Sequence, residues 1–293
     1  MLSPVEKVER IYLEGEVMRT RSDLDIAELR SALAAAAERT AQLIRSASDS
    51  GTRVPGLTWT VGETAAHLVG ALSAYTGFVD GSRDAADDLA GMPGTNAPAE
   101  RGDIMSARLL QEITERDGDR LADLLASAST GYLKAVEGHR LDEPILTWTG
   151  VAMTVPVMTS AMLGELLLHG WDIARATGAR PTIARREALL VIDGIVALIP
   201  DYVDPEKTRG LHVTYELRLR GGRRYIVDIE NGTAQIDPPN AQVDCWISAD
   251  PAAFLLVGYG RVSQWGQALR GRMLSGGRKP WLGLKFGQLV GKV

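Results

Sequence analysis

Three ionisable side chains lie within eight residues of an otherwise apolar, small or hydroxyl-bearing stretch. Residues 156–174 read PVMTSAMLGELLLHGWDIA, with Glu165, His169 and Asp172 as the ionisable members. On a helix at about 100° per residue, His169 lies about 40° from Glu165, and Asp172 lies about 20° from it on the other side. All three therefore share one stripe of a helix that is predicted to be buried all round. Burying them together is costly unless they pair, hydrogen-bond or bind a metal.

Metal binding is the chemistry that this spacing favours. A Glu followed four residues later by a His lets both side chains reach one divalent ion from one helix face. His67 offers a third ligand, because it is flanked by AAHLVGALSA, which contains no other charged residue. Three ligands with a fourth position left for water or substrate match the open coordination of catalytic zinc. Asp172 is better suited to orient His169 than to bind the metal directly.

A short motif of this kind has simpler explanations, which stay open at this point. The chain has 37 acidic residues and four histidines in 293 positions. An acidic residue four positions before a histidine is therefore expected by chance about 0.5 times in the chain. His169 would then donate to Asp172 or Glu165 in a satisfied core network, and His67 would be a partly buried histidine near a helix start. The other two histidines suit a metal less, since His139 lies in a polar loop and His212 in an alternating strand.

Four long helices are predicted to position these residues. Thr60 and Glu63 form a capping-box pattern at the start of the second helix. Pro156 opens the fourth helix in its first turn, and Gly178 ends it. Residues 80–103 are rich in Gly, Pro and Asp and are predicted as a long loop of the kind that often covers a site. A four-helix bundle is expected, with helices at residues 26–48, 60–80, 104–137 and 156–178 and a small hairpin at 145–157.

The second half of the chain indicates an α+β domain. The linker ARPT separates it from the bundle, which predicts a first domain at 1–178, including an N-terminal extension at 1–23, and a second domain at 179–293. Strands are expected at 211–220, 223–229 and 243–248. Helical segments are expected at 185–199, 250–258, 262–271 and 279–290.

Composition excludes several classes of protein. A chain of 293 residues suits two domains of about 150 residues each. The single cysteine, Cys245, cannot form an internal disulfide, which suits a reducing cytoplasm and excludes a Cys-rich metal cluster. No stretch reaches the roughly 18 apolar residues of a membrane span, and the N-terminus lacks the pattern of a signal peptide. The net charge of -5 argues against nucleic acid as the main partner.

Charge is nevertheless uneven along the chain. After Asp250 there are seven basic residues and no acidic one. This segment is interpreted either as a site for a small anion or as a solvated basic tail.

Two paired motifs resemble a known family. LTWTVGETAAHLVG and GELLLHGWDIARATG are similar to the metal-binding domain of mycothiol-dependent maleylpyruvate isomerases, a branch of the DinB-like bundles, over about residues 25–178. The resemblance implies that His67, Glu165 and His169 bind a divalent metal, usually zinc. VDCWISADPAAFLLVGYGR resembles the sterol-carrier-like domain that often follows such bundles. This second resemblance implies that an arginine of the C-terminal domain serves the active site, and Arg261 is the nearest match. Arg101 is a second candidate on the substrate side.

The first functional hypothesis is a zinc-dependent enzyme that activates a borrowed thiol. A thiol bound to zinc is deprotonated at neutral pH and becomes a nucleophile for isomerisation of, or transfer to, a small electrophile. Cys245, in an alternating strand, is predicted to be a packing residue, so mycothiol is the implied co-substrate. The alternative is a non-catalytic, metal-containing carrier that binds an apolar ligand in its C-terminal domain, and a third possibility is an interaction protein. The sequence leaves the substrate and the oligomeric state open.

Overall fold

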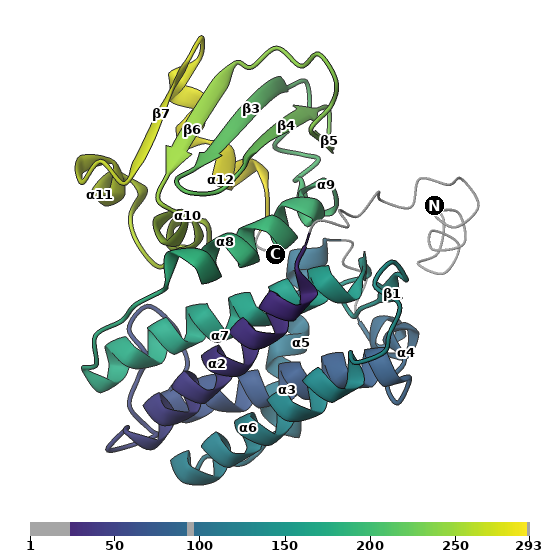
Figure 1. The fold of residues 1–293 in the computed structure, drawn as a ribbon, viewed down its shortest axis with the longest axis vertical. Helices are drawn as coiled ribbons and strands as arrows, with labels where there is room; N and C mark the ends of the chain where they lie inside the picture. The colour runs from purple at the N-terminus through teal and green to yellow at the C-terminus, as the bar shows by residue number, and fades with distance from the viewer. Residues whose placement is uncertain (1–23, 93–96, 292–293) are drawn as a thin grey trace. The chain divides into compact units, whose positions relative to one another are not determined.

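The computed structural model describes residues 24–92 and 97–291 and divides into two compact units, Met1–Thr182 and Ile183–Val293 (Figure 1). The predicted N-terminal extension, residues 1–23, lies outside the described residues. No helix in the described part of the chain is both long and apolar enough to span a membrane. The two units are considered separately below.

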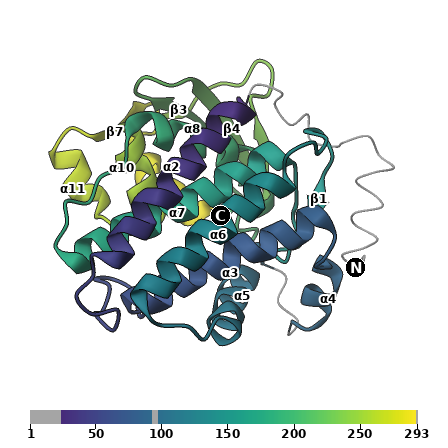
Figure 2. The same cartoon turned by 60° about the horizontal axis from the view of Figure 1, so that its bottom comes forward.

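Four long helices form the core of the first unit. Helices α2 and α3 each contact both α6 and α7, so the four enclose a common apolar interior (Figure 2). Helix α5 packs on α3, and strands β1 and β2 form a small antiparallel hairpin, as predicted. The helices are α2 (Ile26–Arg45), α3 (Val61–Asp80), α4 (Ala85–Ala90), α5 (Pro98–Glu112), α6 (Gly118–Ala135) and α7 (Val155–Thr177), and the strands are β1 (Ile145–Leu146) and β2 (Ala152–Met153).

Local sequence signals fix the ends of the two helices that carry the candidate ligands. Thr60 Oγ1 accepts from the backbone N–H of Glu63 at 3.2 Å, and the Glu63 carboxylate accepts from the Thr60 N–H at 2.7 Å. The predicted capping box of α3 is thus confirmed. Helix α7 has Pro156 in its first turn and ends at Gly178, whose φ of 75° is a left-handed conformation that favours glycine.

The prediction of one helix at 104–137 is wrong. Helix α5 begins earlier, at Pro98, and the chain breaks between Glu112 and Gly118 before α6 begins. The break occurs because Asp117 caps α6, its side chain accepting from the Arg120 N–H at 3.0 Å. The prediction of a long loop at residues 80–103 is also wrong in part. This segment contains the short helix α4, capped by Asp84, and the start of α5.

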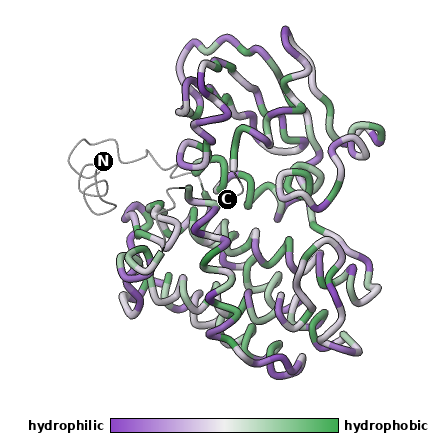
Figure 3. The backbone as a smooth tube through the Cα atoms, turned by 180° about the vertical axis from the view of Figure 1, so that it is seen from behind, coloured by the Kyte–Doolittle hydropathy of each residue, from purple (hydrophilic) through white to green (hydrophobic). Residues whose placement is uncertain are grey.

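A five-stranded mixed sheet forms the centre of the second unit. Its strand order is β5-β4-β3-β6-β7, with β3 and β6 parallel and the other pairs antiparallel. Figure 3 shows hydrophobic and hydrophilic residues interspersed along the chain, and on β4 the alternate residues Tyr225, Val227 and Ile229 are buried. The elements are α8 (Arg185–Ile195), η1 (Val196–Leu198), α9 (Ile199–Tyr202), β3 (His212–Leu219), β4 (Arg224–Glu230), β5 (Thr233–Ile236), β6 (Cys245–Ala249), α10 (Pro251–Gly258), α11 (Gln264–Leu269), β7 (Met273–Gly277), η2 (Pro280–Leu284) and α12 (Phe286–Leu289).

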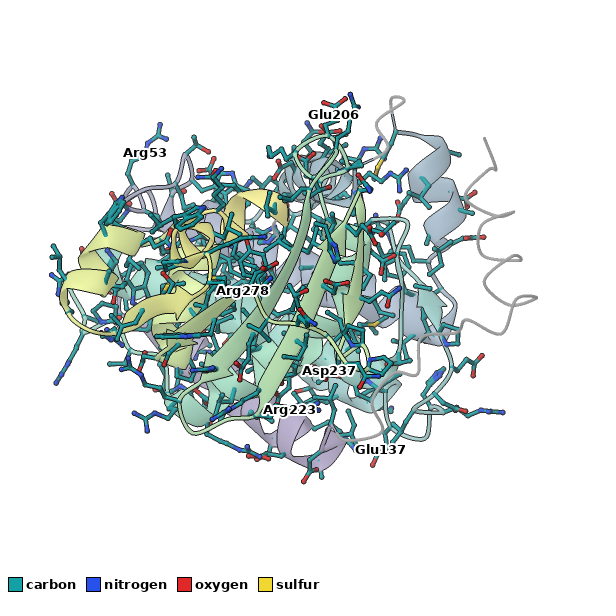
Figure 4. All side chains as sticks on the ribbon, turned by 90° about the horizontal axis from the view of Figure 1, so that it is seen from above. Arg53, Glu137, Glu206, Arg223, Asp237 and Arg278 are labelled. Carbon is teal, nitrogen blue, oxygen red and sulfur yellow. The ribbon has the colours of Figure 1, made fainter. Side chains whose placement is uncertain are left out.

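Two strands of this sheet were not predicted. Strand β5 follows a tight turn in which Asn231 and Gly232 both have positive φ, 47° and 92°, as a two-residue hairpin turn requires. An ion pair of 3.0 Å between Arg223 and Asp237 lies at the far end of this hairpin (Figure 4). Strand β7 reads MLSGG, which contains no β-branched residue, so only its pairing with β6 makes it a strand. The predicted helix at 279–290 is instead two short pieces, η2 and α12.

Candidate metal centre

Three of the predicted site residues converge inside the first unit. His67 projects from α3, while Glu165 and His169 project from α7, which packs against α3. The Glu165 Oε2 atom lies 3.1 Å from His67 Nε2 and 3.4 Å from His169 Nε2. Three potential ligand atoms, one from each residue, lie within 4.8 Å of one another. Both histidines are buried, whereas the Glu165 side chain keeps 28% of its surface exposed, so the cluster is open on the carboxylate side.

The donor set and its spacing fit a divalent metal. Two imidazole nitrogens and a carboxylate oxygen are ligands that zinc takes readily, at about 2.0–2.1 Å. Tetrahedral ligands at that bond length lie about 3.3 Å from one another. The two distances to Glu165 Oε2, 3.1 and 3.4 Å, agree with this spacing. Both pairs that involve Glu165 therefore suit one shared ion, and all three ligand atoms lie within 4.8 Å of one another.

At His67 and Glu165, the electrostatics favour the protonation states that a metal requires. Burial lowers the pKa of His67, and its hydrogen bond to Glu165 offsets only part of that effect. Burial would raise the pKa of Glu165, but hydrogen bonds from His169 and His67 outweigh it and bring the pKa well below its ordinary value. A neutral imidazole and an ionised carboxylate are thus present at neutral pH, and both are competent ligands.

His169 differs from His67 because it also faces Asp172. Burial would lower the pKa of His169, but its hydrogen bonds to Asp172 and Glu165 outweigh burial and raise it. Asp172 is buried, and its Oδ2 atom lies 3.2 Å from His169 Nδ1. The opposite ring nitrogen, Nε2, is the one that faces Glu165. Asp172 thus contacts the ring nitrogen that is not needed for metal binding.

An aromatic ring that the sequence reasoning did not assign covers both histidines. The Trp59 ring centroid lies 4.9 Å from that of His67 and 5.9 Å from that of His169. Trp59 is held in place by a fold-back of the preceding segment, in which its carbonyl accepts from the Val54 N–H at 3.0 Å. The available signal was its position in the LTWT motif, directly before the capping box of α3.

The two arginines predicted on the substrate side make other contacts. Arg101, on α5, donates from Nη1 to the carbonyl oxygen of Thr149 at 2.8 Å. It thereby fastens the turn of the β1–β2 hairpin, where Gly150 has a φ of 76°. Arg261 lies in the second unit and donates to the carbonyl oxygen of Tyr259 at 3.0 Å. A role of either arginine toward a substrate stays a prediction.

Cys245 has the character of a packing residue, as predicted. It is fully buried in β6. Burial raises the pKa of its thiol, which disfavours the nucleophilic thiolate. The chain's own cysteine is therefore poorly suited to serve as a nucleophile.

The second unit contains an apolar cavity of about 280 Å³. Its lining side chains are uncharged, and they include Ile199, Phe254, Val262, Met273 and Phe286. This cavity is where an apolar ligand of the second unit would find room.

A helical unit with a His–Glu–His cluster, followed by a unit built on a mixed sheet, defines the class of fold. A sequence model described as the mycothiol maleylpyruvate isomerase N-terminal domain matches residues 29–174, which include all three residues of the cluster. Through this domain, the chain belongs to the mycothiol-dependent maleylpyruvate isomerase family.

Solved structures agree with this assignment at the level of the fold. The chain is similar to the crystal structure of the mycothiol-dependent maleylpyruvate isomerase, with 14% sequence identity, a TM-score of 0.50, and coverage of 88% of this chain and 95% of that chain. A mutant of that isomerase with one histidine replaced by alanine matches with the same values. The two-part architecture of helices and sheet is thus shared with the isomerase fold. Among curated proteins, the comparison found no match.

Proposed function

We propose that the protein is a divalent-metal-dependent enzyme that uses a small thiol, mycothiol, to isomerise or conjugate a small electrophilic substrate. The observation that carries the proposal is the convergence of His67, Glu165 and His169 within the family's N-terminal domain. Zinc is the metal that best suits two imidazoles and one carboxylate. A maleylpyruvate-like substrate, with carboxylates beside an electrophilic double bond, is the substrate class that the family name suggests.

We further propose that residues 1–178 are a DinB-like metal-binding bundle and residues 179–293 a sterol-carrier-like domain. The mutual packing of α2, α3, α6 and α7 supports the first assignment. The mixed sheet and its apolar cavity support the second.

The chain's own residues would divide the work as follows. A metal held by His67, Glu165 and His169 supplies the positive charge that lowers the pKa of a bound thiol, so that it reacts as a thiolate at neutral pH. Asp172 Oδ2 lies 3.2 Å from His169 Nδ1, close enough for Asp172 to attract the proton to Nδ1 and so keep Nε2 free to bind. Trp59 covers the two imidazoles and limits the access of water to them. Arg101 and Arg261 are the candidates for holding substrate carboxylates.

The thiol must come from outside the chain, because the one cysteine is buried and its pKa is raised. A free thiol as co-substrate and an unpaired cysteine both suit a reducing compartment, and we place the protein in the cytoplasm.

The competing function is a non-catalytic carrier in which the metal is structural. The apolar cavity in the second unit is the observation that supports the carrier hypothesis. Family membership favours the isomerase class. The carrier hypothesis predicts no thiol-dependent turnover, so an activity assay separates the two.

Metal content is the first test. We expect the purified protein to contain about one equivalent of a divalent metal, and we expect H169A and E165Q to lose it. His212→Ala is the matched control, because this histidine also contacts a carboxylate, at 3.2 Å from Asp228, but lies outside the cluster. A protein without metal, or H169A with full metal content, would refute the proposed centre.

Thiol dependence is the second test. The metal-loaded protein is assayed against maleylpyruvate and a panel of other small electrophiles, with and without mycothiol. We expect turnover only when the thiol is present, and its loss in E165Q. Equal rates with and without mycothiol would exclude the thiol-dependent reaction while leaving the metal centre intact.

A further inference from the structure

The orientation of the His67 ring is not fixed by a second hydrogen bond. Its Nε2 atom lies 3.1 Å from Glu165 Oε2, and its Nδ1 atom is buried without a hydrogen-bond partner among the described residues. A metal-binding histidine almost always donates its other ring N–H to a partner, which fixes the ring. Rotation about the Cβ–Cγ bond of histidine is broad and roughly two-fold, so a half turn would place a carbon atom where Nε2 faces Glu165. Another contact must therefore hold this ring.

Trp59 is the contact that the structure offers. Its ring centroid lies 4.9 Å from that of His67, with 38° between the two planes, and 5.9 Å from that of His169, with 35° between the planes. The two imidazoles are themselves 5.1 Å apart and meet edge to face, at 72°. The three rings thus pack against one another, and a turn of either imidazole would move its edge against a neighbouring ring.

The segment that carries Trp59, residues 53–60, is fastened to the helix that carries two of the candidate ligands. Arg175, on α7, donates from Nη1 to the carbonyl oxygen of Pro55 at 3.3 Å. The guanidinium of Arg175 also lies over the ring of Trp171 on the same helix, 4.7 Å from its centroid, and this cation–π contact orients the arginine. At its other end the segment runs directly into α3. It is therefore joined to both helices that carry candidate ligands.

We propose that Trp59 is a positioning residue of the metal centre and that Arg175 keeps it in place. Ring packing by Trp59 takes the role of the hydrogen bond that His67 Nδ1 lacks. A ligand that is held in its binding orientation before the metal arrives loses less freedom on binding, which raises the affinity. The inference rests on the proposed metal centre and goes beyond it, because neither Trp59 nor Arg175 is a ligand.

Zinc affinity tests the role of Trp59. The full-length protein competes for zinc with a chromophoric chelator, which gives the dissociation constant. Trp59→Leu should weaken zinc binding by about tenfold, the lower end of the effect of losing a partner that orients a ligand. Trp59→Phe, which keeps an aromatic ring over the imidazoles, should retain most of the affinity.

A matched control separates positioning from a general loss of stability. Trp246 is half-buried like Trp59 but lies in the second unit. Trp246→Leu and Trp59→Leu should both lower the free energy of unfolding of the metal-free protein, whereas only Trp59→Leu should change the zinc dissociation constant. Because both tryptophans are half-buried, both variants are expected to fold, which circular dichroism verifies.

The role of Arg175 is tested in the same assay. Arg175→Gln should weaken zinc binding by about twofold to tenfold, the range that corresponds to one net hydrogen bond. If Arg175 acts through Trp59, Arg175→Gln should have no further effect in the Trp59→Leu protein. Arg180→Gln is the control, because Arg180 is also exposed, lies in the same unit and loses the same charge. Equal losses in the two arginine variants would overturn the role of Arg175.

Failure of this inference differs from failure of the metal centre. If the unsubstituted protein binds no zinc, the metal centre itself is refuted. If the unsubstituted protein binds zinc and Trp59→Leu binds it as tightly, only the role of Trp59 is overturned. Equal losses of affinity in Trp59→Leu and Trp246→Leu would also overturn that role, since the effect would not depend on contact with the imidazoles.

Discussion

Replacing Asp172 by Asn tests the most specific geometric feature of the proposed metal centre. Asp172 Oδ2 lies 3.2 Å from His169 Nδ1, and His169 Nε2 lies 3.4 Å from Glu165 Oε2. A neutral imidazole carries one N–H, and the carboxylate of Asp172 draws it to Nδ1, which leaves the Nε2 lone pair for the metal. In D172N the amide N–H₂ can face the ring instead and stabilise the other tautomer, in which Nε2 is protonated.

The expected magnitude follows from the role of such a partner. Losing the carboxylate that orients a metal-binding histidine typically reduces metal affinity by about 10–100-fold, or about 1.4–2.7 kcal/mol. The loss of metal affinity in D172N should be smaller than the loss caused by replacing a ligand, because all three ligand atoms remain. Competition of the protein with a chromophoric chelator measures the zinc dissociation constant directly.

A buried polar control separates an effect on the metal from an effect on folding. Tyr132 Oη and Thr159 Oγ1 lie 3.0 Å apart in the same helical unit, and both side chains are buried. Tyr132→Phe should lower the free energy of unfolding by about 1 kcal/mol and leave the zinc affinity unchanged. If D172N binds zinc as tightly as the unsubstituted protein, Asp172 does not orient His169 and the reasoning is refuted.

Three further predictions concern stability. Thr60→Ala should lower the free energy of unfolding by about 1 kcal/mol in denaturant titrations through loss of the capping box, whereas exposed Thr58→Ala should not; equal midpoints would contradict this. Gly276→Ala should cost about 1–3 kcal/mol, because its Cβ would meet a tryptophan ring of the neighbouring strand. Gly287→Ala, with open space around it, should be tolerated, so equal losses would contradict the steric argument. Asp244 has a lowered pKa because ion pairs with two basic side chains outweigh its burial. The contribution of Asp244 to the free energy of unfolding is therefore present above pH 3.8 and lost as the pH falls further. The free energy of unfolding of D244N should decrease less on acidification, and identical pH profiles for the two proteins would exclude this contribution.

The elements that carry the ligands were predictable because their signals are local. Pro156 and Gly178 mark the ends of α7, and Thr60 with Glu63 marks the start of α3. Each of these signals depends on backbone groups within a few residues of the signal itself. The spacing of Glu165 and His169 on one helix face follows in turn from helix geometry alone.

Features that depend on distant pairing were missed. Strand β7 has no strand-like sequence and exists because β6 offers it a hydrogen-bonding edge. The break between α5 and α6 had a local signal, Asp117 followed by Gly118, but helical periodicity on both sides concealed it. The position of Trp59 over both imidazoles required the fold-back of residues 53–60, which no periodic pattern reveals.

The contents of the cluster argue against a purely structural polar network. One histidine would be enough to neutralise Glu165, yet two imidazoles face the same carboxylate oxygen. A satisfied network also leaves no buried polar atom unpaired, whereas among the residues that the structure describes the Nδ1 atoms of both His67 and His169 are buried without a hydrogen bond of normal geometry. In the absence of a metal, the raised pKa of His169 favours a proton on that ring beside the ionised Glu165. A divalent metal would displace this proton from Nε2 and use all three facing atoms, so proton and metal compete for one set of lone pairs.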